Sequence, residues 1–138
     1  MTNSLKLTAI GLAATFGLAA AAAADVTGQM PPASTKKGVT YAADIKPILD
    51  QSCIKCHSGN KPKARLRLDS LESALRGSKD GKVILAGNSA SSQLVLSASH
   101  LATDKDLWMP PKRAEKKFAP LTAGQIGLIR AWIDQGAK

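Results

Sequence analysis

Both cysteines of this 138-residue chain lie three positions apart, in the stretch CIKCH at residues 53–57. The second cysteine is followed directly by His57, one of only two histidines. Cys-x-x-Cys is found in redox dithiols, zinc sites and covalent cofactor anchors, so this stretch limits what the chain can be more than any other. The compartment of the chain helps to decide between these interpretations.

The first 24 residues have the layout of a secretory signal peptide. A short polar region with Lys6 precedes an apolar run, which starts at Leu7 and ends in an alanine tract before Asp25. We predict a signal peptide over residues 1–24, cleaved after Ala24 or within a few residues of it. An uncleaved membrane anchor is the alternative, but this alanine-rich run is at the lower limit of what spans a bilayer. The mature chain is therefore expected in the periplasm, without a stable membrane span.

The rest of the chain is long enough for one small domain. Residues 25–39 are rich in Pro, Gly, Ser, Thr and Lys and have no apolar period, so they are predicted to form a flexible N-terminal linker. The domain is predicted over residues 40–138. With two Trp, two Phe and one Tyr in the chain, its core would be thin, and a large buried cofactor would supply apolar volume.

The chain is strongly basic, with 19 Lys and Arg against 10 Asp and Glu. Nucleic acid, a membrane surface or an acidic protein could each be the partner of such a charge. Export and the lack of interleaved aromatic residues for base stacking argue against nucleic acid. We therefore expect acidic protein partners. The chain itself is expected to be a monomer.

A helix is predicted over residues 40–51, which lead into the cysteines. Ile45, Ile48 and Leu49 have helical spacing there. Pro47 predicts a bend or a late helix start, because proline lacks a backbone N–H.

Two short helices are predicted in the middle of the chain. Asp69 is the expected cap of the first, which ends at Gly77. Asn88 or Ser89 is the expected cap of the second, which runs through residues 94–98.

The last helix has the clearest signals. Thr122 and Gln125 form a capping box, and Gly136 marks the end. Gly127 inside this helix costs about 1 kcal/mol relative to Ala. Close approach of another helix would explain this cost, and simple tolerance of the glycine is the alternative. Since residues 82–86 are the only candidate strand, the chain is predicted to be all-α. The apolar face of the last helix consists of Ile126, Ile129, Trp132 and Ile133.

The CIKCH stretch is best explained as a haem attachment site. A redox dithiol normally lies near a βαβ pattern, which is missing here. A zinc site would need distant His100 to join Cys53, Cys56 and the crowded neighbour His57. In the haem interpretation, both thiols form thioether bonds and His57 lies beneath the iron, as in the c-type attachment signal.

The sixth iron ligand is left open by this motif. Met109 is the first candidate, because it lies in WMPP at residues 108–111, where two prolines prevent a helix and stiffen the loop. It could also be an ordinary core methionine. His100, an open site and Met30 are the alternatives, and Met30 lies in QMPP within the predicted linker.

Residues 40–138 resemble a small monohaem class I c-type cytochrome, specifically the planctomycete-type cytochrome c domain. The resemblance implies a class I cytochrome c fold, with three to five helices wrapped around one covalently bound haem c. It also implies thioethers at Cys53 and Cys56, proximal His57 and distal Met109 as iron ligands. The charged run at residues 112–117 departs from the shorter, glycine-rich link expected there. The motifs that carry the resemblance are IKPIL (45–49), CIKCH, RLDS (67–70), GNS (87–89) with Ser92 and Leu94, MPP (109–111), LT (121–122) and AWIDQGA (131–137).

The function expected from these features is one-electron transfer between periplasmic or membrane redox partners, and not enzymatic catalysis. An open-site haem sensor or enzyme, or an electron-transfer subunit of a larger periplasmic oxidoreductase, are the alternatives. One or two of Arg65, Arg67 and Trp108 are expected to bind haem propionates. Two basic clusters are expected to meet at the haem edge and steer acidic redox proteins. They consist of Lys55, Lys61, Lys63, Arg65 and Arg67, and of Lys112, Arg113, Lys116 and Lys117.

Overall fold

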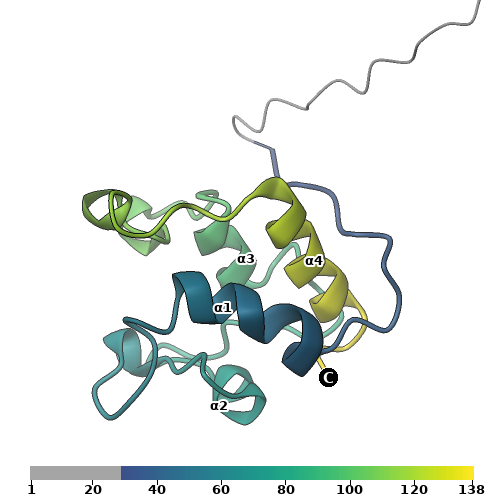
Figure 1. Cartoon of the computed structure of the whole chain (residues 1–138), viewed down its shortest axis with the longest axis horizontal. Coiled ribbons are helices and arrows are strands. Elements are labelled where there is room, and N and C mark those ends of the chain that lie inside the picture. Colours follow the sequence, from purple (N-terminus) through teal and green to yellow (C-terminus); the bar gives the residue numbers. More distant parts are fainter. Residues whose placement is uncertain (1–28) are drawn as a thin grey trace, which may run out of the picture.

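The computed structural model describes residues 29–138, so the predicted signal peptide lies outside the described residues. Within this part the chain is all-α, as predicted, and contains no strand (Figure 1). None of its helices is long and apolar enough to cross a bilayer. The elements are a π-helix η1 (Tyr41–Ile45), α1 (Lys46–Ser52), α2 (Leu71–Arg76), α3 (Gln93–Ala98), α4 (Ala123–Asp134) and the short 3₁₀ helices η2 (Lys63–Arg65), η3 (Lys105–Leu107) and η4 (Lys112–Ala114).

The N-terminal helical segment begins with a capped π-turn. The Thr40 side chain accepts a hydrogen bond from the Ala43 N–H, and Asp44 accepts one from the Thr40 N–H at 2.9 Å. The α-helix starts only at Lys46, so Pro47 lies in its first turn. A proline is tolerated there because the first helical N–H groups have no partner within the helix. The predicted late start is confirmed.

The two middle helices have different caps from those predicted. Ser70, not Asp69, caps α2 by accepting a hydrogen bond from the Ser73 N–H, because the Asp69 carboxylate is bound by the Arg67 guanidinium. Gly77 ends this helix with a positive φ, as predicted. Helix α3 starts later than Asn88 or Ser89 would allow, with Ser92 at its N-cap position.

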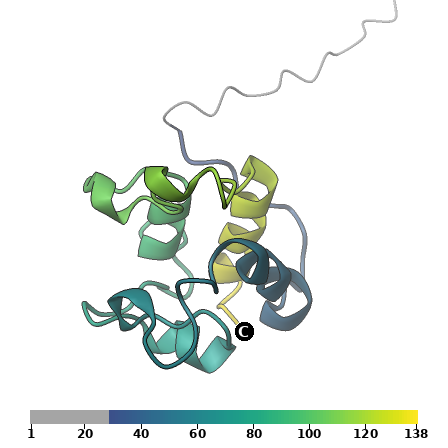
Figure 2. The same cartoon turned by 60° about the vertical axis from the view of Figure 1, so that its left-hand side comes forward.

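Helix α4 is confirmed with its capping box and with Gly136, in the left-handed region, just beyond its end. It lies between the N-terminal helical segment and α3 (Figures 1 and 2). Trp132 is fully buried, and its ring lies 5.9 Å from the ring of Tyr41. The Tyr41 hydroxyl donates to the Leu68 carbonyl at 2.8 Å, which ties α4 and η1 to the segment before α2. Ile45, Leu49, Ile129 and Ile133 complete the centre of the core.

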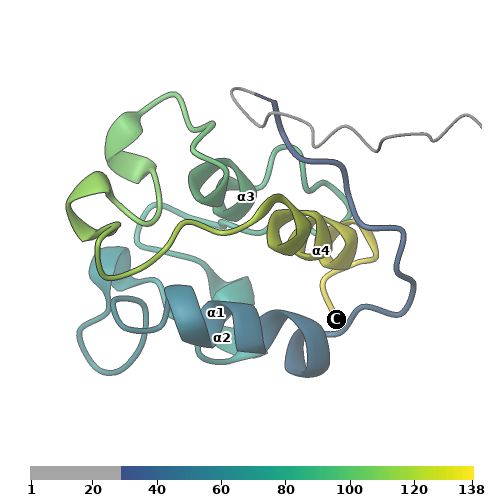
Figure 3. The same cartoon turned by 45° about the horizontal axis from the view of Figure 1, so that its top comes forward.

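The described part of the predicted linker, residues 29–39, runs beside α4 (Figure 3) and is called the N-terminal arm below. The Ser34 N–H donates to the Gly127 carbonyl at 2.8 Å, and Val39 is buried. Gln135 bonds both Val39 and Lys36, at 3.2 and 2.8 Å. The close approach that Gly127 permits is therefore that of the N-terminal arm, not of another helix.

One polar cluster joins the arm to the loop before α3. Ser89 donates to the Asp134 carboxylate from its backbone N–H at 2.8 Å and from its hydroxyl at 2.9 Å. Arg130 donates to the Ser89 hydroxyl at 3.0 Å and to the Pro31 carbonyl. Ser89 is almost fully buried. It does not cap α3, as the sequence predicted, but anchors the loop before α3 to Arg130 and Asp134 of α4.

Candidate functional site

The CIKCH stretch forms a compact turn at the end of α1. The N–H of Cys53 donates to the Leu49 carbonyl at 2.8 Å, which continues the helical pattern by one residue. The N–H groups of Cys56 and His57 then both donate to the Cys53 carbonyl, at 3.1 and 3.0 Å. Both thiols are free, with Cys53 half-buried and Cys56 exposed. The turn thus brings two thiols and one imidazole together.

The following segment holds this turn from the other side. The Leu68 N–H donates to the His57 carbonyl at 2.8 Å, and the Lys63 N–H donates to the Cys56 carbonyl at 2.9 Å. The Ser58 hydroxyl donates back to the Ile54 carbonyl at 2.6 Å. Hydrogen bonds from the following segment therefore hold the backbone of the CIKCH turn in place.

His57 is buried, with 8 % of its surface exposed, and its Nδ1 atom has no hydrogen-bond partner among the described residues. Burial lowers the pKa of His57, and the backbone of Leu66 and Lys63 offsets part of this effect. The neutral imidazole is the form that binds a metal ion. A buried, neutral imidazole directly beside two thiols is a candidate ligand for a metal ion held at this turn.

The Cys53 thiol differs from that of a redox-active dithiol. Burial, followed by the neighbouring Cys56, raises the pKa of Cys53 to about 11. Reactive thiols in redox enzymes have lowered pKa values instead, because the thiolate is the nucleophile. This finding argues against the dithiol interpretation of the CIKCH turn.

Met109 lies on a separate loop that starts at the end of α3. Its N–H donates to the Ser97 carbonyl at 3.0 Å, and its side chain is half-buried. The indole N–H of Trp108 donates to the Ala102 carbonyl at 2.9 Å. Within residues 29–138, no hydrogen bond joins this loop to the CIKCH turn.

The other candidates for an iron ligand are occupied differently. The Nε2 atom of His100 lies 3.2 Å from the Met109 carbonyl oxygen. Met30 is half-buried in the N-terminal arm, where it packs against the hydrophobic core. In the described part of the chain no group of three His, Cys, Asp or Glu side chains gathers that could hold a metal ion. His100 therefore does not complete a zinc site with the CIKCH turn.

The comparisons with known proteins agree with this geometry. Residues 53–113 match the family model described as planctomycete cytochrome C. Over this range the chain is similar to a planctomycete-type cytochrome c domain. No match to a curated protein or to a solved structure was found. The family indicates a haem-binding electron-transfer protein whose cofactor is haem c with its iron.

The matched part of the chain contains every residue of the predicted site. It begins at Cys53 and ends at Arg113, inside η4, so it also contains Met109. The charged run at residues 112–117, which departs from the expected pattern, starts where the match ends. Lys112 and Arg113 are exposed on the 3₁₀ turn there.

Among the predicted propionate ligands of the cytochrome c domain, two already have partners. Arg67 forms a bidentate pair with Asp69, at 3.1 and 2.7 Å, and Trp108 donates to Ala102. Arg65 is exposed on η2. Figures 1 and 3 show η2 and η4 at the same end of the molecule, away from the C terminus.

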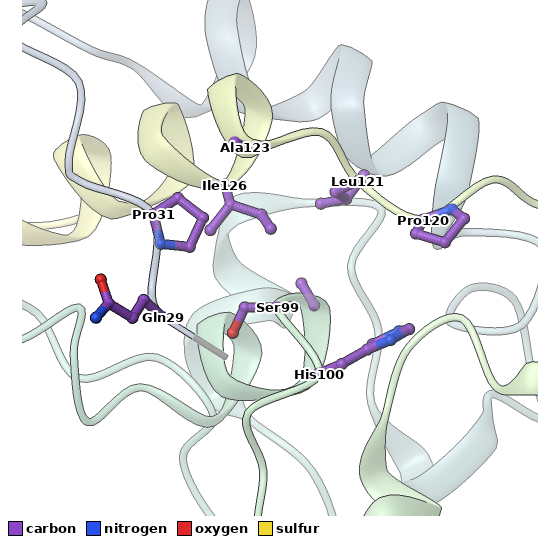
Figure 4. A pocket seen from close by; sticks show the side chains of 9 residues that line it. Gln29, Pro31, Ser99, His100, Pro120, Leu121, Ala123 and Ile126 are labelled. Carbon is purple, nitrogen blue, oxygen red and sulfur yellow. The ribbon is translucent and has the colours of Figure 1, made fainter. Parts of the chain in front are cut away.

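A pocket of about 150 Å³ lies between the N-terminal arm, the end of α3 and the start of α4 (Figure 4). Ser99 and His100 line it just after the end of α3, and Leu121 and Ile126 line it from the other side. Ligand pockets usually measure about 300–1,000 Å³. None of the CIKCH residues lines this pocket, so it is separate from the cysteine turn of the cytochrome c domain.

The sequence alone missed the contacts of His100 with Trp108 and Met109. It identified His100 only as a competing ligand. These contacts depend on the positive φ of His100 at the end of α3. Only the structure shows that His100 occupies this position, so the sequence offered no signal for them.

Proposed function

We propose that this protein is an exported one-electron carrier with one haem c, attached through Cys53 and Cys56 and ligated by His57 and Met109. The observation that carries the proposal is the CIKCH turn: two free thiols lie next to a buried imidazole whose pKa is lowered by its burial. The match to planctomycete cytochrome C supports the same cofactor.

The residues of the turn fit a covalently attached haem. Each thiol would add across one vinyl group, so that its S–H hydrogen moves to carbon and a thioether forms without an added oxidant. The neutral His57 imidazole would donate a lone pair to the iron. When bound, the haem supplies an iron that alternates between the ferric and ferrous states. The protein holds the ligands in place and keeps water from the site.

Met109 is favoured as the sixth ligand for two reasons. Both its backbone N–H and its carbonyl are held at the end of α3, which fixes the place from which its side chain starts. Its competitor His100 directs Nε2 at the Met109 carbonyl, so this nitrogen is already used. A methionine ligand raises the reduction potential relative to a second histidine, as suits a carrier.

The proposed partners are acidic redox proteins. Lys63 and Arg65 on η2 lie at the same end of the molecule as Lys112 and Arg113 on η4 (Figures 1 and 3). All four side chains are exposed. Such a basic surface speeds encounter with acidic proteins, and salt screens it. We also propose that the protein is a periplasmic monomer. Its signal peptide would be cleaved after Ala24, and its domain would span residues 40–138.

The test is to express the full chain with the haem-attachment machinery and purify it from the periplasm. We expect one covalent haem per chain, a reversible one-electron redox titration and no binding of carbon monoxide. A high-spin protein that binds carbon monoxide would instead indicate an open-site sensor or enzyme. A protein without covalent haem would contradict the proposal altogether.

A further inference from the structure

His100 occupies a helix-end position that normally belongs to glycine. Helix α3 is closed by two hydrogen bonds of a Schellman motif, from the Leu101 N–H to the Leu96 carbonyl at 2.8 Å and from the His100 N–H to the Ser97 carbonyl at 3.2 Å. In this motif the residue after the C-cap adopts a left-handed conformation, which glycine accepts best. His100 adopts it with φ 58°.

A side chain at such a strained position calls for a functional explanation. The His100 ring stacks on the Trp108 ring, with centroids 5.1 Å apart and planes inclined by 5°. Its Nε2 atom lies 3.2 Å from the Met109 carbonyl oxygen. Because a carbonyl can only accept, Nε2 must carry the proton in this hydrogen bond. One side chain therefore contacts two consecutive residues of the opposite segment.

Three further contacts hold the Trp108–Met109 segment, one from α3, one from the loop after it and one from η3. The Ser97 carbonyl accepts from the Met109 N–H at 3.0 Å, and the Ala102 carbonyl accepts from the Trp108 indole at 2.9 Å. The Lys105 ammonium lies 5.6 Å from the centroid of the Trp108 ring. With His100 on the Met109 carbonyl, both polar backbone groups of Met109 are held.

We propose that His100 is a positioning residue that clamps the Trp108–Met109 segment and so holds the Met109 thioether for the iron. This inference rests on the proposed function, in which Met109 is the sixth ligand. Loss of the clamp removes one hydrogen bond and one ring stack from the closed loop. The loop therefore opens more often, and an added ligand that competes with Met109 binds more tightly.

The test compares His100→Gly with wild type in the purified holoprotein. Glycine removes the clamp but relieves the left-handed backbone, so a purely structural role predicts an equal or better fold and an unchanged loop. We expect the ferric protein to bind added imidazole roughly tenfold more tightly, at an unchanged or higher unfolding temperature. Amide hydrogen exchange at Trp108 and Met109 should also quicken.

Two further variants keep the test decisive. His100→Asn tolerates the left-handed conformation but lacks the ring, and it should also bind imidazole more tightly. Ser99→Ala is the matched control, because it removes a hydrogen bond to the Val95 carbonyl within α3 and leaves Met109 untouched. Its imidazole affinity should equal that of wild type.

Several outcomes would overturn the role of His100. One is a His100→Gly protein with wild-type imidazole affinity, and another is an equal change in Ser99→Ala. A wild type that lacks the far-red sulfur-to-iron band and loses its low-spin spectrum in His100→Gly would show that His100 itself ligates the iron. Failure of the proposed function looks different. If Met109 does not ligate the iron, the Met109→Ala variant should bind imidazole with the same affinity as wild type.

Discussion

Gly127 of α4 meets the Pro32 carbonyl so closely that a Cβ atom at position 127 would lie 2.7 Å from the Pro32 oxygen. The Gly127 carbonyl in turn accepts a hydrogen bond from the Ser34 N–H at 2.8 Å. A glycine in mid-helix costs about 1 kcal/mol in helix propensity. Docking of the N-terminal arm on Gly127 offsets this cost.

Gly127→Ala is expected to destabilise the protein by roughly 1–3 kcal/mol, because the new methyl group must push the arm away. The measurement is chemical denaturation of the holoprotein, together with amide hydrogen exchange at Ser34, which should quicken. Gly124→Ala is the matched control in the same helix, since the nearest atom to its Cβ is the Thr122 hydroxyl oxygen at 3.9 Å. That variant should be neutral or more stable, and equal effects of both substitutions would disprove the docking account.

Asp44 should make stability depend on acid pH. Hydrogen bonds from the Lys36 side chain, and then from the Thr40 backbone, lower the pKa of the Asp44 carboxyl. The stabilisation by Asp44 is therefore fully present above the unfolded pKa of about 4, and it is lost as the pH falls through the lower folded value. Wild type should melt above Asp44→Asn at neutral pH, and the difference should shrink below about pH 4. Asp80→Asn controls for the loss of one acidic charge, and a difference constant with pH would refute the prediction.

The two cysteines should each contribute one thioether bond. Cys53→Ser and Cys56→Ser are each expected to keep haem through the remaining bond, whereas the double variant should lose all of it on denaturation. Mass spectrometry of the denatured chains measures this directly. Ser58→Ala is the neighbouring control, because the Ser58 hydroxyl only bonds the Ile54 carbonyl. A double variant that still carried covalent haem would argue against attachment at these thiols.

The basic end of the molecule should control encounter with acidic partners. Reversing Lys112 and Arg113 to Glu is expected to slow electron exchange with an acidic redox protein roughly tenfold at low salt. The effect should fade as salt shortens the Debye length below about 10 Å. The control reverses Lys37 and Lys138, which are exposed on the arm and at the C terminus. Equal slowing by both pairs would mean that net charge alone matters.

Local signals in the sequence predicted much of this fold. Predictions that depend on residues within one turn of helix were correct. Examples are the capping box of Thr122 with Gln125 and the end of α2 at Gly77. The CIKCH turn is also closed by local contacts, because the N–H groups of Cys56 and His57 both bond the Cys53 carbonyl.

Contacts between distant segments explain the differences. Asp69 is not a cap because Arg67 binds its carboxylate, and Ser89 is not a cap because Asp134 lies 45 positions later in the chain but beside it in space. The docking of the arm on Gly127 and the clamp of His100 on Met109 likewise depend on tertiary packing, which periodicity does not report. The role of Met109 as an iron ligand is still a prediction.

The measurement that tests the central claim most directly is the visible spectrum of the ferric holoprotein. We predict a low-spin spectrum with the weak far-red sulfur-to-iron band, lost in Met109→Ala and kept in Met30→Ala. A band that survives Met109→Ala, or a low-spin spectrum without any such band, would contradict His57 and Met109 as the axial ligands.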